Sequence, residues 1–216
     1  MKKMTERRDQ PRRALNWQGV KRGVIVIGAS AGGVEVVGRL FSMLPRDLPA
    51  VIGYVMHRGM IPGHLAAVLG RRSSLPIREP QTGETVQRGM IYLAPADQHL
   101  LFSPQGIEVN RGQRERGTRP AVDPLFRSAA ATYGDRVVGV VLTGGGQDGT
   151  HGMIAITQSD GLTLVQNPDD AHMPYIPLSA IQGDHVKGVY ALEDLPAVLG
   201  TLAQGGSVDG PPEKRR

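Results

Sequence analysis

Three side chains that could carry out covalent hydrolysis follow short apolar runs of the sequence. Ser30 stands in the Gly-Ala-Ser-Ala-Gly segment 28–32, shortly after the apolar run 23–27, while His57 follows a second apolar run and Asp148 a third. A serine hydroxyl is a weak nucleophile near neutral pH, so it needs an imidazole to take its proton and usually a carboxylate to orient that imidazole. These three residues are therefore candidates for nucleophile, base and orienting group.

The Gly-x-Ser-x-Gly spacing around Ser30 has more than one interpretation. Between a strand and a helix it suits a nucleophile elbow, where small neighbours permit the sharp turn that exposes a serine Oγ. In a chain with 29 glycines it can also be a tight turn capped by Ser30, or a loop whose free N–H groups bind an anion at a helix N-terminus. Residues 28–34 lack the Lys-Ser/Thr of a P-loop and the Gly-x-Gly-x-x-Gly of a dinucleotide site. The spacing alone supports a hydrolase and an anion-binding protein about equally.

The proposed partners of Ser30 also have structural alternatives. His57 is the one histidine directly at the end of an expected parallel strand. Asp148 precedes a helix expected from Gly149, so it could serve as that helix's N-cap, and both roles can coexist. The sequence has no His-Glu-x-x-His or comparable cluster, so we expect no metal site. The remaining histidines are expected to be surface or hydrogen-bonded residues: His64, His99, His151, His172 and His185.

The apolar patterning predicts that strands and helices alternate along most of the chain. Short β-branched runs without polar alternation indicate buried parallel strands, and apolar residues at helical spacing indicate helices between them. The expected strands are 23–27, 50–56, 137–142, 162–165 and 188–192, and the expected helices are 33–43, 62–71, 124–133, from about 149, from about 174, and 194–203.

The region 75–110 differs, because its short β-prone pieces are separated by Gly and Pro turns and predict a hairpin-rich insertion. The whole pattern indicates an α/β fold, with a three-layer, doubly wound, mostly parallel sheet and a β-hairpin insertion. Ligands of such sheets bind at the carboxyl ends of the strands. Ser30, His57 and Asp148 are all expected there.

Composition predicts one domain between two charged ends. A chain of 216 residues with 40% hydrophobic content can bury one substantial core. Residues 1–22 hold eight basic and two acidic residues and the last three residues are basic, which leaves 14 basic and 18 acidic residues between them, a net charge of −4. That distribution argues against a nucleic-acid-binding body. We expect a basic, disordered arm (1–22), one domain (23–203) and a flexible tail (204–216).

Cysteine is absent from the sequence, which excludes disulfides, a thiolate nucleophile and cysteine-ligated zinc. The N-terminus is charged and the apolar runs are short, so we expect no signal peptide and no transmembrane helix. We therefore expect a cytoplasmic protein that neither inserts into membranes nor binds nucleic acid.

Five segments of the sequence stand in the order of the motifs of one known family: 26–33 (Val-Ile-Gly-Ala-Ser-Ala-Gly-Gly), 92–95 (Tyr-Leu-Ala-Pro) with His99-Leu100, 119–126 (Arg-Pro-Ala-Val-Asp-Pro-Leu-Phe), 142–149 (Leu-Thr-Gly-Gly-Gly-Gln-Asp-Gly) and 171–186. Together they resemble the catalytic domain of CheB-type protein-glutamate methylesterases, which act on chemotaxis receptors. The resemblance extends over about residues 23–203.

The resemblance implies a cytoplasmic serine hydrolase that removes methyl esters from glutamate side chains of chemoreceptor signalling helices, often with glutamine deamidation. It makes Ser30 the nucleophile, His57 the general base and acid, and Asp148 the group that orients His57. It also implies an oxyanion site built from backbone N–H groups, with Ala31 and Gly145 as the expected donors. The resemblance further implies that no cofactor is needed. The alternative is a non-catalytic regulatory or anion-binding module on the same fold.

Four departures from the family pattern qualify these expectations. Only 22 residues precede the first expected strand, so we expect a stand-alone domain without a fused receiver domain, with a separate regulatory protein as a possible partner. Gly145 stands where the family commonly has methionine. Segments 58–60 and 175–177 also differ from the usual residues, which concerns the receptor-facing surface rather than ester hydrolysis itself.

Overall fold

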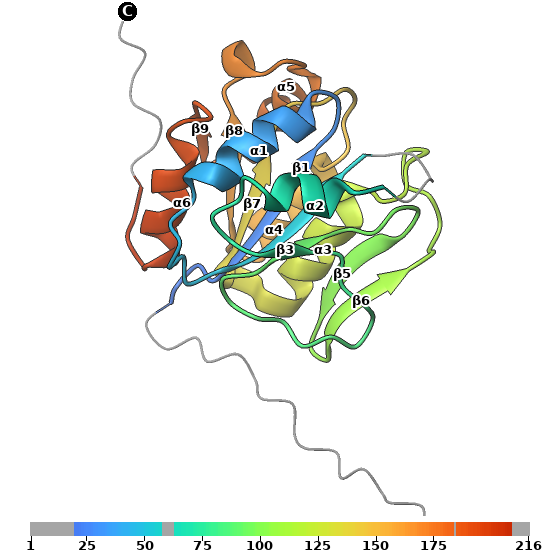
Figure 1. Ribbon diagram of the computed structural model, residues 1–216. Helices are drawn as coiled ribbons and strands as arrows, with labels where there is room; N and C mark the ends of the chain where they lie inside the picture. The colour runs from blue at the N-terminus through green and yellow to red at the C-terminus, as the bar shows by residue number, and fades with distance from the viewer. Residues whose placement is uncertain (1–19, 58–62, 184, 209–216) are drawn as a thin grey trace, which may run out of the picture.

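The computed structural model describes residues 20–57, 63–183 and 185–208, which form a parallel sheet of seven strands in the order β3–β4–β2–β1–β7–β8–β9 (Figure 1). Every neighbouring pair is parallel. The strands are β1 (Val24–Ala29), β2 (Val51–Met56), β3 (Ile77–Arg78), β4 (Ile91–Leu93), β7 (Val137–Val141), β8 (Leu162–Gln166) and β9 (Gly188–Tyr190).

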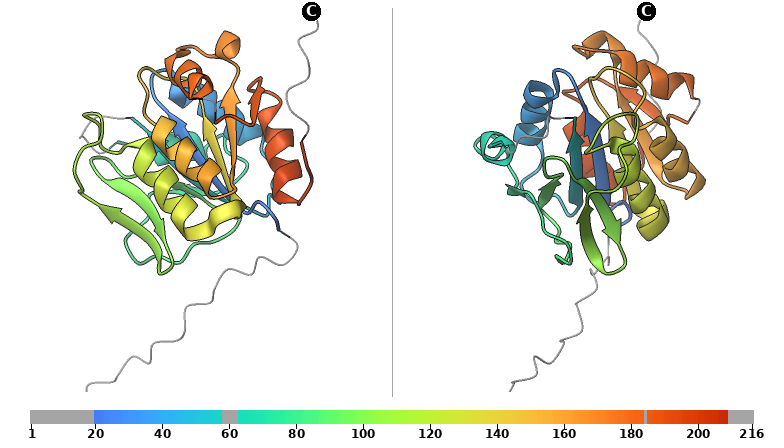
Figure 2. Two further views of the ribbon diagram at one scale, coloured as in Figure 1. Left: turned by 180° about the vertical axis from the view of Figure 1, so that it is seen from behind. Right: turned by 90° about the vertical axis from the view of Figure 1, so that its right-hand side faces the viewer.

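Helices cover both faces of this sheet, as the edge-on view in Figure 2 shows. Alternate side chains of β1 divide between two apolar clusters, since Ile25 and Ile27 belong to one and Val24 and Val26 to the other. The first cluster includes side chains of α1, α2 and α6, and the second includes those of α3, α4 and α5. The helices are α1 (Gly33–Met43), α2 (Leu65–Gly70), α3 (Val122–Tyr133), α4 (Thr150–Gln158), α5 (Tyr175–Gln182) and α6 (Leu195–Ala203). The predicted three-layer α/β fold is confirmed.

The region 75–110 is only partly a hairpin insertion. β5 (His99–Ser103) and β6 (Gly106–Asn110) form the expected antiparallel pair, which packs on α3 through Leu100, Phe102 and Ile107. The two earlier pieces, β3 and β4, instead join the edge of the main parallel sheet beside β2. Their shortness hid this, because two or three residues carry too little pattern to distinguish a parallel edge strand from a hairpin arm.

The ends of the chain fall largely outside the described residues, which omit 1–19 and 209–216. Val20 and Arg22, which belong to the arm predicted from the sequence, contact the domain: Val20 is buried, and the Arg22 guanidinium donates to the carbonyl of Asp160 at 2.9 Å. In the described ranges, no helix combines the length and hydropathy of a bilayer-spanning segment.

The strand order brings the three candidate residues to one place. The chain leaves β1 toward β2 on one side and later returns to β7 on the other side, so the loops after β1, β2 and β7 meet at the carboxyl edge of adjacent central strands. This reversal of strand order is where open α/β sheets bind their ligands. Ser30, His57 and Asp148 occupy those three loops.

Candidate active site

Ser30 stands in a tight turn between β1 and α1 that is held by backbone hydrogen bonds. The Ser30 N–H donates to the carbonyl of Thr143 at 3.0 Å, and the Gly33 N–H donates to the carbonyl of Ser30 at 2.8 Å. Gly32 has φ 77°, a left-handed conformation that favours glycine, and caps α1. Two N–H groups of the turn are thus bound to backbone carbonyls, one within the turn and one in the loop after β7, and neither is free for an anion.

His57 follows β2 and bridges the other two candidates. Its N–H donates to the carbonyl of Ala29 at 3.2 Å, which holds it beside the Ser30 turn. Its Nδ1 lies 3.1 Å from Ser30 Oγ, and its Nε2 lies 2.6 Å from Asp148 Oδ2. Because an ionised carboxylate can only accept, the neutral imidazole carries its proton on Nε2 and offers the Nδ1 lone pair to the serine hydroxyl. This is the tautomer that a general base requires.

Asp148 is buried, with 3% of its surface exposed, and its carboxylate has three donors. Besides His57, the Val122 N–H donates to Oδ2 at 2.7 Å and the Asp123 N–H donates to Oδ1 at 3.0 Å. Burial alone would raise the pKa of Asp148, but the hydrogen bonds from His57, Val122 and Asp123 outweigh it and lower the pKa below its ordinary value. Asp148 is therefore ionised when His57 is neutral.

The sequence offered Asp148 as a possible N-cap of α4, and that assignment is wrong. The N-cap of α4 is Gly149, with φ 102°, and among the described residues the Asp148 side chain makes no bond to that helix. Asp148 instead caps α3, a helix 26 residues earlier in the chain, whose own N-cap residue Ala121 has no side-chain acceptor. A cap supplied by a distant residue leaves no local sequence signal.

Both backbone donors expected for an oxyanion are available, whereas a neighbouring N–H is occupied. The Gly144 N–H is occupied, because it donates to the carbonyl of Met173 at 2.8 Å. The N–H groups of Ala31 and Gly145 have no hydrogen-bond partner within the described ranges. Ala31 lies in the turn after Ser30. Gly145 follows Gly144, which is so close to the nucleophile candidate that a Cβ added to Gly144 would lie 2.8 Å from Ser30 Cβ. Both expected donors thus lie next to the nucleophile candidate and are free to bind an anionic oxygen.

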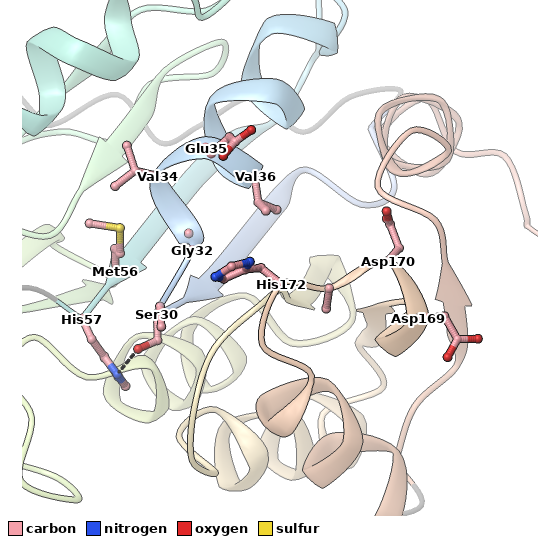
Figure 3. A pocket seen from close by; sticks show the side chains of 13 residues that line it. Ser30, Gly32, Val34, Glu35, Val36, Met56, His57, Asp169, Asp170 and His172 are labelled. Carbon is pink, nitrogen blue, oxygen red and sulfur yellow. Dashed lines mark hydrogen bonds between the residues drawn. The ribbon is translucent and has the colours of Figure 1, made fainter.

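A cleft of about 870 Å³ opens beside Ser30 and His57. The start of α1 and Met56 form one wall, and the segment after β8 forms the other, with Asp169 and Asp170 on the far side from His57 (Figure 3). The ring of His172 lies against Gly32, so close that an added Cβ there would be 2.9 Å from His172 Cδ2. From the sequence His172 is expected to be an ordinary surface residue, and the structure places it over the turn that carries Ser30 (Figure 3).

Thr143 and Gln166 hold the Ser30 turn and the segment after β8 through hydrogen bonds. Neither residue was identified from the sequence. The buried Thr143 hydroxyl donates to the carbonyl of Ala31 at 3.1 Å and accepts from the Met173 N–H at 2.8 Å. The Thr143 N–H donates to Gln166 Oε1 at 3.0 Å, and Gln166 Nε2 donates to the carbonyl of Asp170 at 3.2 Å. Both are polar residues that directly follow expected buried strands, and this was the available signal, since buried polar groups need partners.

His99 is one of the histidines expected at the surface or in hydrogen bonds. His99 is buried, where its Nδ1 accepts from the Ala121 N–H at 3.3 Å and its Nε2 donates to the carbonyl of Gln113 at 2.9 Å. Segment 58–60, which departs from the family pattern, lies outside the described residues. In the part of the chain that the structure describes, no three His, Asp or Glu side chains gather as a metal site would require.

A parallel α/β sheet whose central loops join a serine, a histidine and a buried aspartate in one hydrogen-bond series is the architecture of a serine hydrolase. Comparison with known proteins agrees with this class and narrows it. The model of the CheB methylesterase family matches residues 25–199, and the chain belongs to that family.

Similar proteins cover the same region. A relative from Leptospira interrogans is 34% identical over 182 residues, which are 83% of this chain and 94% of that protein. The protein-glutamate methylesterase/protein-glutamine glutaminase of Pyrococcus abyssi is 35% identical over 82% of this chain, which spans 50% of that protein. The crystal structure of the Thermotoga maritima CheB methylesterase catalytic domain matches with a TM-score of 0.80 at 31% identity, covering 85% of this chain and all of that one.

Proposed function

We propose that this protein hydrolyses methyl esters of glutamate side chains on a protein substrate, with Ser30, His57 and Asp148 as its triad. The observation that carries the proposal is the continuous series from Ser30 Oγ through His57 to Asp148, at 3.1 and 2.6 Å. Membership of the CheB methylesterase family supports the ester as the bond that is cleaved.

Acylation of Ser30 is the first half of the reaction. His57 Nδ1 takes the hydroxyl proton as Ser30 Oγ attacks the ester carbonyl carbon, and Asp148 stabilises the imidazolium through Nε2. The carbonyl oxygen becomes an oxyanion, for which the free N–H groups of Ala31 and Gly145 are the proposed donors. The tetrahedral intermediate collapses when His57 returns the proton to the methoxy oxygen, and methanol leaves.

Deacylation uses the same groups in the same order. A water molecule loses a proton to His57 and attacks the Ser30 acyl ester, and the second tetrahedral intermediate releases a glutamate side chain and the free serine. A glutamine side chain would follow the same path with ammonia as the leaving group. Deamidation is therefore part of the proposal, as the names of the Pyrococcus relatives also suggest.

The proposed substrates are methylated signalling helices of chemoreceptor-type proteins in the cytoplasm. The cleft beside Ser30 is open rather than enclosed, with Ala31 and His172 at its edge. Such a site suits a single side chain presented by a large partner better than a small free metabolite, which would require a pocket that surrounds it. A separate regulatory protein is also part of the proposal.

The test is release of methanol from methylated receptor by the purified protein. We expect wild-type protein to release methanol and to react with a fluorophosphonate probe at Ser30, and Ser30→Ala to do neither. The free energy of unfolding of Ser30→Ala should match that of the wild type, which excludes misfolding as the cause. Labelling of Ser30 without methanol release would retain the hydrolase and reject the glutamyl ester, and the absence of both would reject the enzyme.

A further inference from the structure

Two buried aspartates at the carboxyl edge of the sheet cap each other's helices. Asp148, just before α4, accepts from the Val122 and Asp123 N–H groups at the start of α3. Asp123, in the first turn of α3, accepts on Oδ1 from the Gly149 N–H at 3.1 Å and the Gly152 N–H at 2.7 Å, at the start of α4. Each carboxylate thus satisfies donors that the other helix cannot satisfy internally.

This exchange couples the position of Asp148 to the Asp123 side chain. Gly149 is the next residue after Asp148, so a bond from its N–H to Asp123 fixes the backbone that carries Asp148. Asp148 in turn must hold its Oδ2 at 2.6 Å from His57 Nε2. Of the two acids, Asp148 touches the imidazole, and within the described residues no hydrogen bond joins Asp123 to His57 or Ser30.

The Asp123 side chain is buried and has charged and titratable neighbours. Its side chain is 2% exposed, and Oδ2 faces Arg116 Nε at 3.6 Å, which is beyond hydrogen-bond distance. Arg116 lies at the tip of a two-residue turn between Glu115 and Thr118. Its φ of 49° is a backbone conformation that residues other than glycine adopt at a cost in conformational free energy. The other charged or titratable groups that act on Asp123 are Asp148, His151 and Arg127.

We propose that Asp123 is a positioning residue of the triad: by capping α4 at Gly149 and Gly152 it holds Asp148 in the place from which it orients His57. The proposal rests on the proposed function, since it assigns a role within the same triad. It predicts that the oxygen acceptor of residue 123 matters for turnover, although that residue touches neither the substrate nor the reacting atoms.

The experiment compares Asp123→Ala with Asp123→Asn in methanol release from methylated receptor. Asp123→Ala removes the acceptor, and we expect kcat to fall about 100-fold with KM little changed, because misplacing a catalytic group by about 1 Å costs on that order. Asp123→Asn keeps an oxygen that can accept from both N–H groups, so we expect kcat within about fivefold of the wild type. Rescue by Asn is a result that general destabilisation would not produce.

A matched control lies on the same helix. Ser128→Ala removes the acceptor of the Phe102 N–H from α3 without touching either aspartate, and we expect its kcat to be unchanged. If Asp123→Ala does not fold, Asp123→Ser replaces it, with an intermediate loss of kcat expected from its shorter reach. Wild-type kcat in a folded Asp123→Ala or Asp123→Ser, or an equal loss in Asp123→Asn and Asp123→Ala, would overturn the proposal. Inactivity of the wild type would instead reject the proposed function.

Discussion

The two sides of His57 are built differently. On the Nε2 side, Asp148 is 3% exposed and its carboxylate is held by donors from two elements. On the Nδ1 side, Ser30 faces an open cleft of about 870 Å³ and is followed by the exposed Ala31. The difference indicates a division of labour, in which a rigid, buried half fixes the imidazole and an open half receives a side chain of a protein substrate.

Replacing the acid should break this comparison most strongly. Asp148→Ala leaves the buried N–H groups of Val122 and Asp123 without an acceptor, at about 1–3 kcal/mol each. It also removes the partner that fixes the tautomer of His57, so we expect kcat to fall by about 10³–10⁴. Urea denaturation and methanol release measure the two losses.

Ser30→Ala is the matched comparison for that variant. We expect it to abolish turnover because the proposed nucleophile is absent. The Ser30 hydroxyl satisfies no buried donor among the described residues, so the free energy of unfolding should stay within about 0.5 kcal/mol of the wild type. We therefore expect the Ser30 side to lose activity alone and the Asp148 side to lose activity and stability together. Equal stability of the two variants would contradict the division between a rigid and an open half.

The positions of the proposed triad residues were predictable, whereas the groups that hold them were not. Ser30, His57 and Asp148 each follow a parallel strand, and the carboxyl ends of such strands share one edge of the sheet. The bond from the Asp123 N–H to Asp148 joins residues 25 positions apart, and periodicity carries no information about such pairs.

The same limit applies to the segments around the cleft. His172 comes to lie over Gly32 only because the segment after β8 folds back across the sheet edge, where Thr143 and Gln166 hold it. For β3 and β4 the obstacle was length, because strands of two and three residues are assigned by their neighbours in the sheet rather than by their own pattern.

The glycines after β7 offer a smaller and more local test on the open side. A Cβ on Gly144 would lie 2.5 Å from Ile176 Cδ1 and 2.8 Å from Ser30 Cβ, so Gly144→Ala must displace the nucleophile turn. We expect a loss of about 1–3 kcal/mol in the free energy of unfolding and a fall of about 10–100-fold in kcat.

Gly145 is the control for that prediction. An added Cβ there meets nothing within 4 Å among the described residues, so Gly145→Ala should retain the free energy of unfolding of the wild type. Gly145→Met introduces the residue common in the family and should alter KM for methylated receptor more than kcat. A loss of unfolding free energy in Gly145→Ala as large as that in Gly144→Ala would show that the close contacts at Gly144 do not cause the loss.

The smallest effect is the pH dependence of stability, and it separates the two aspartates of the rigid half. Asp148 has a pKa below its ordinary value of 3.8, because its hydrogen bonds outweigh burial, so its charge contributes stability that is fully present above pH 3.8 and lost as the pH falls through the folded pKa. Asp123 has a raised pKa, chiefly through burial, so its charge costs stability that protonation relieves as the pH falls.

Urea denaturation between about pH 7 and pH 3 should therefore give opposite trends for two isosteric variants. The advantage of the wild type over Asp148→Asn should hold down to about pH 3.8 and shrink below it, because the wild type then begins to lose the favourable charge. The stability of the wild type relative to Asp123→Asn should rise over the same range, because protonation removes an unfavourable one. Trends of the same sign would contradict this difference between the two carboxylates. The difference is that hydrogen-bond donors stabilise the charge of Asp148, whereas the charge of Asp123 is unfavourable and its side chain is held by its capping geometry.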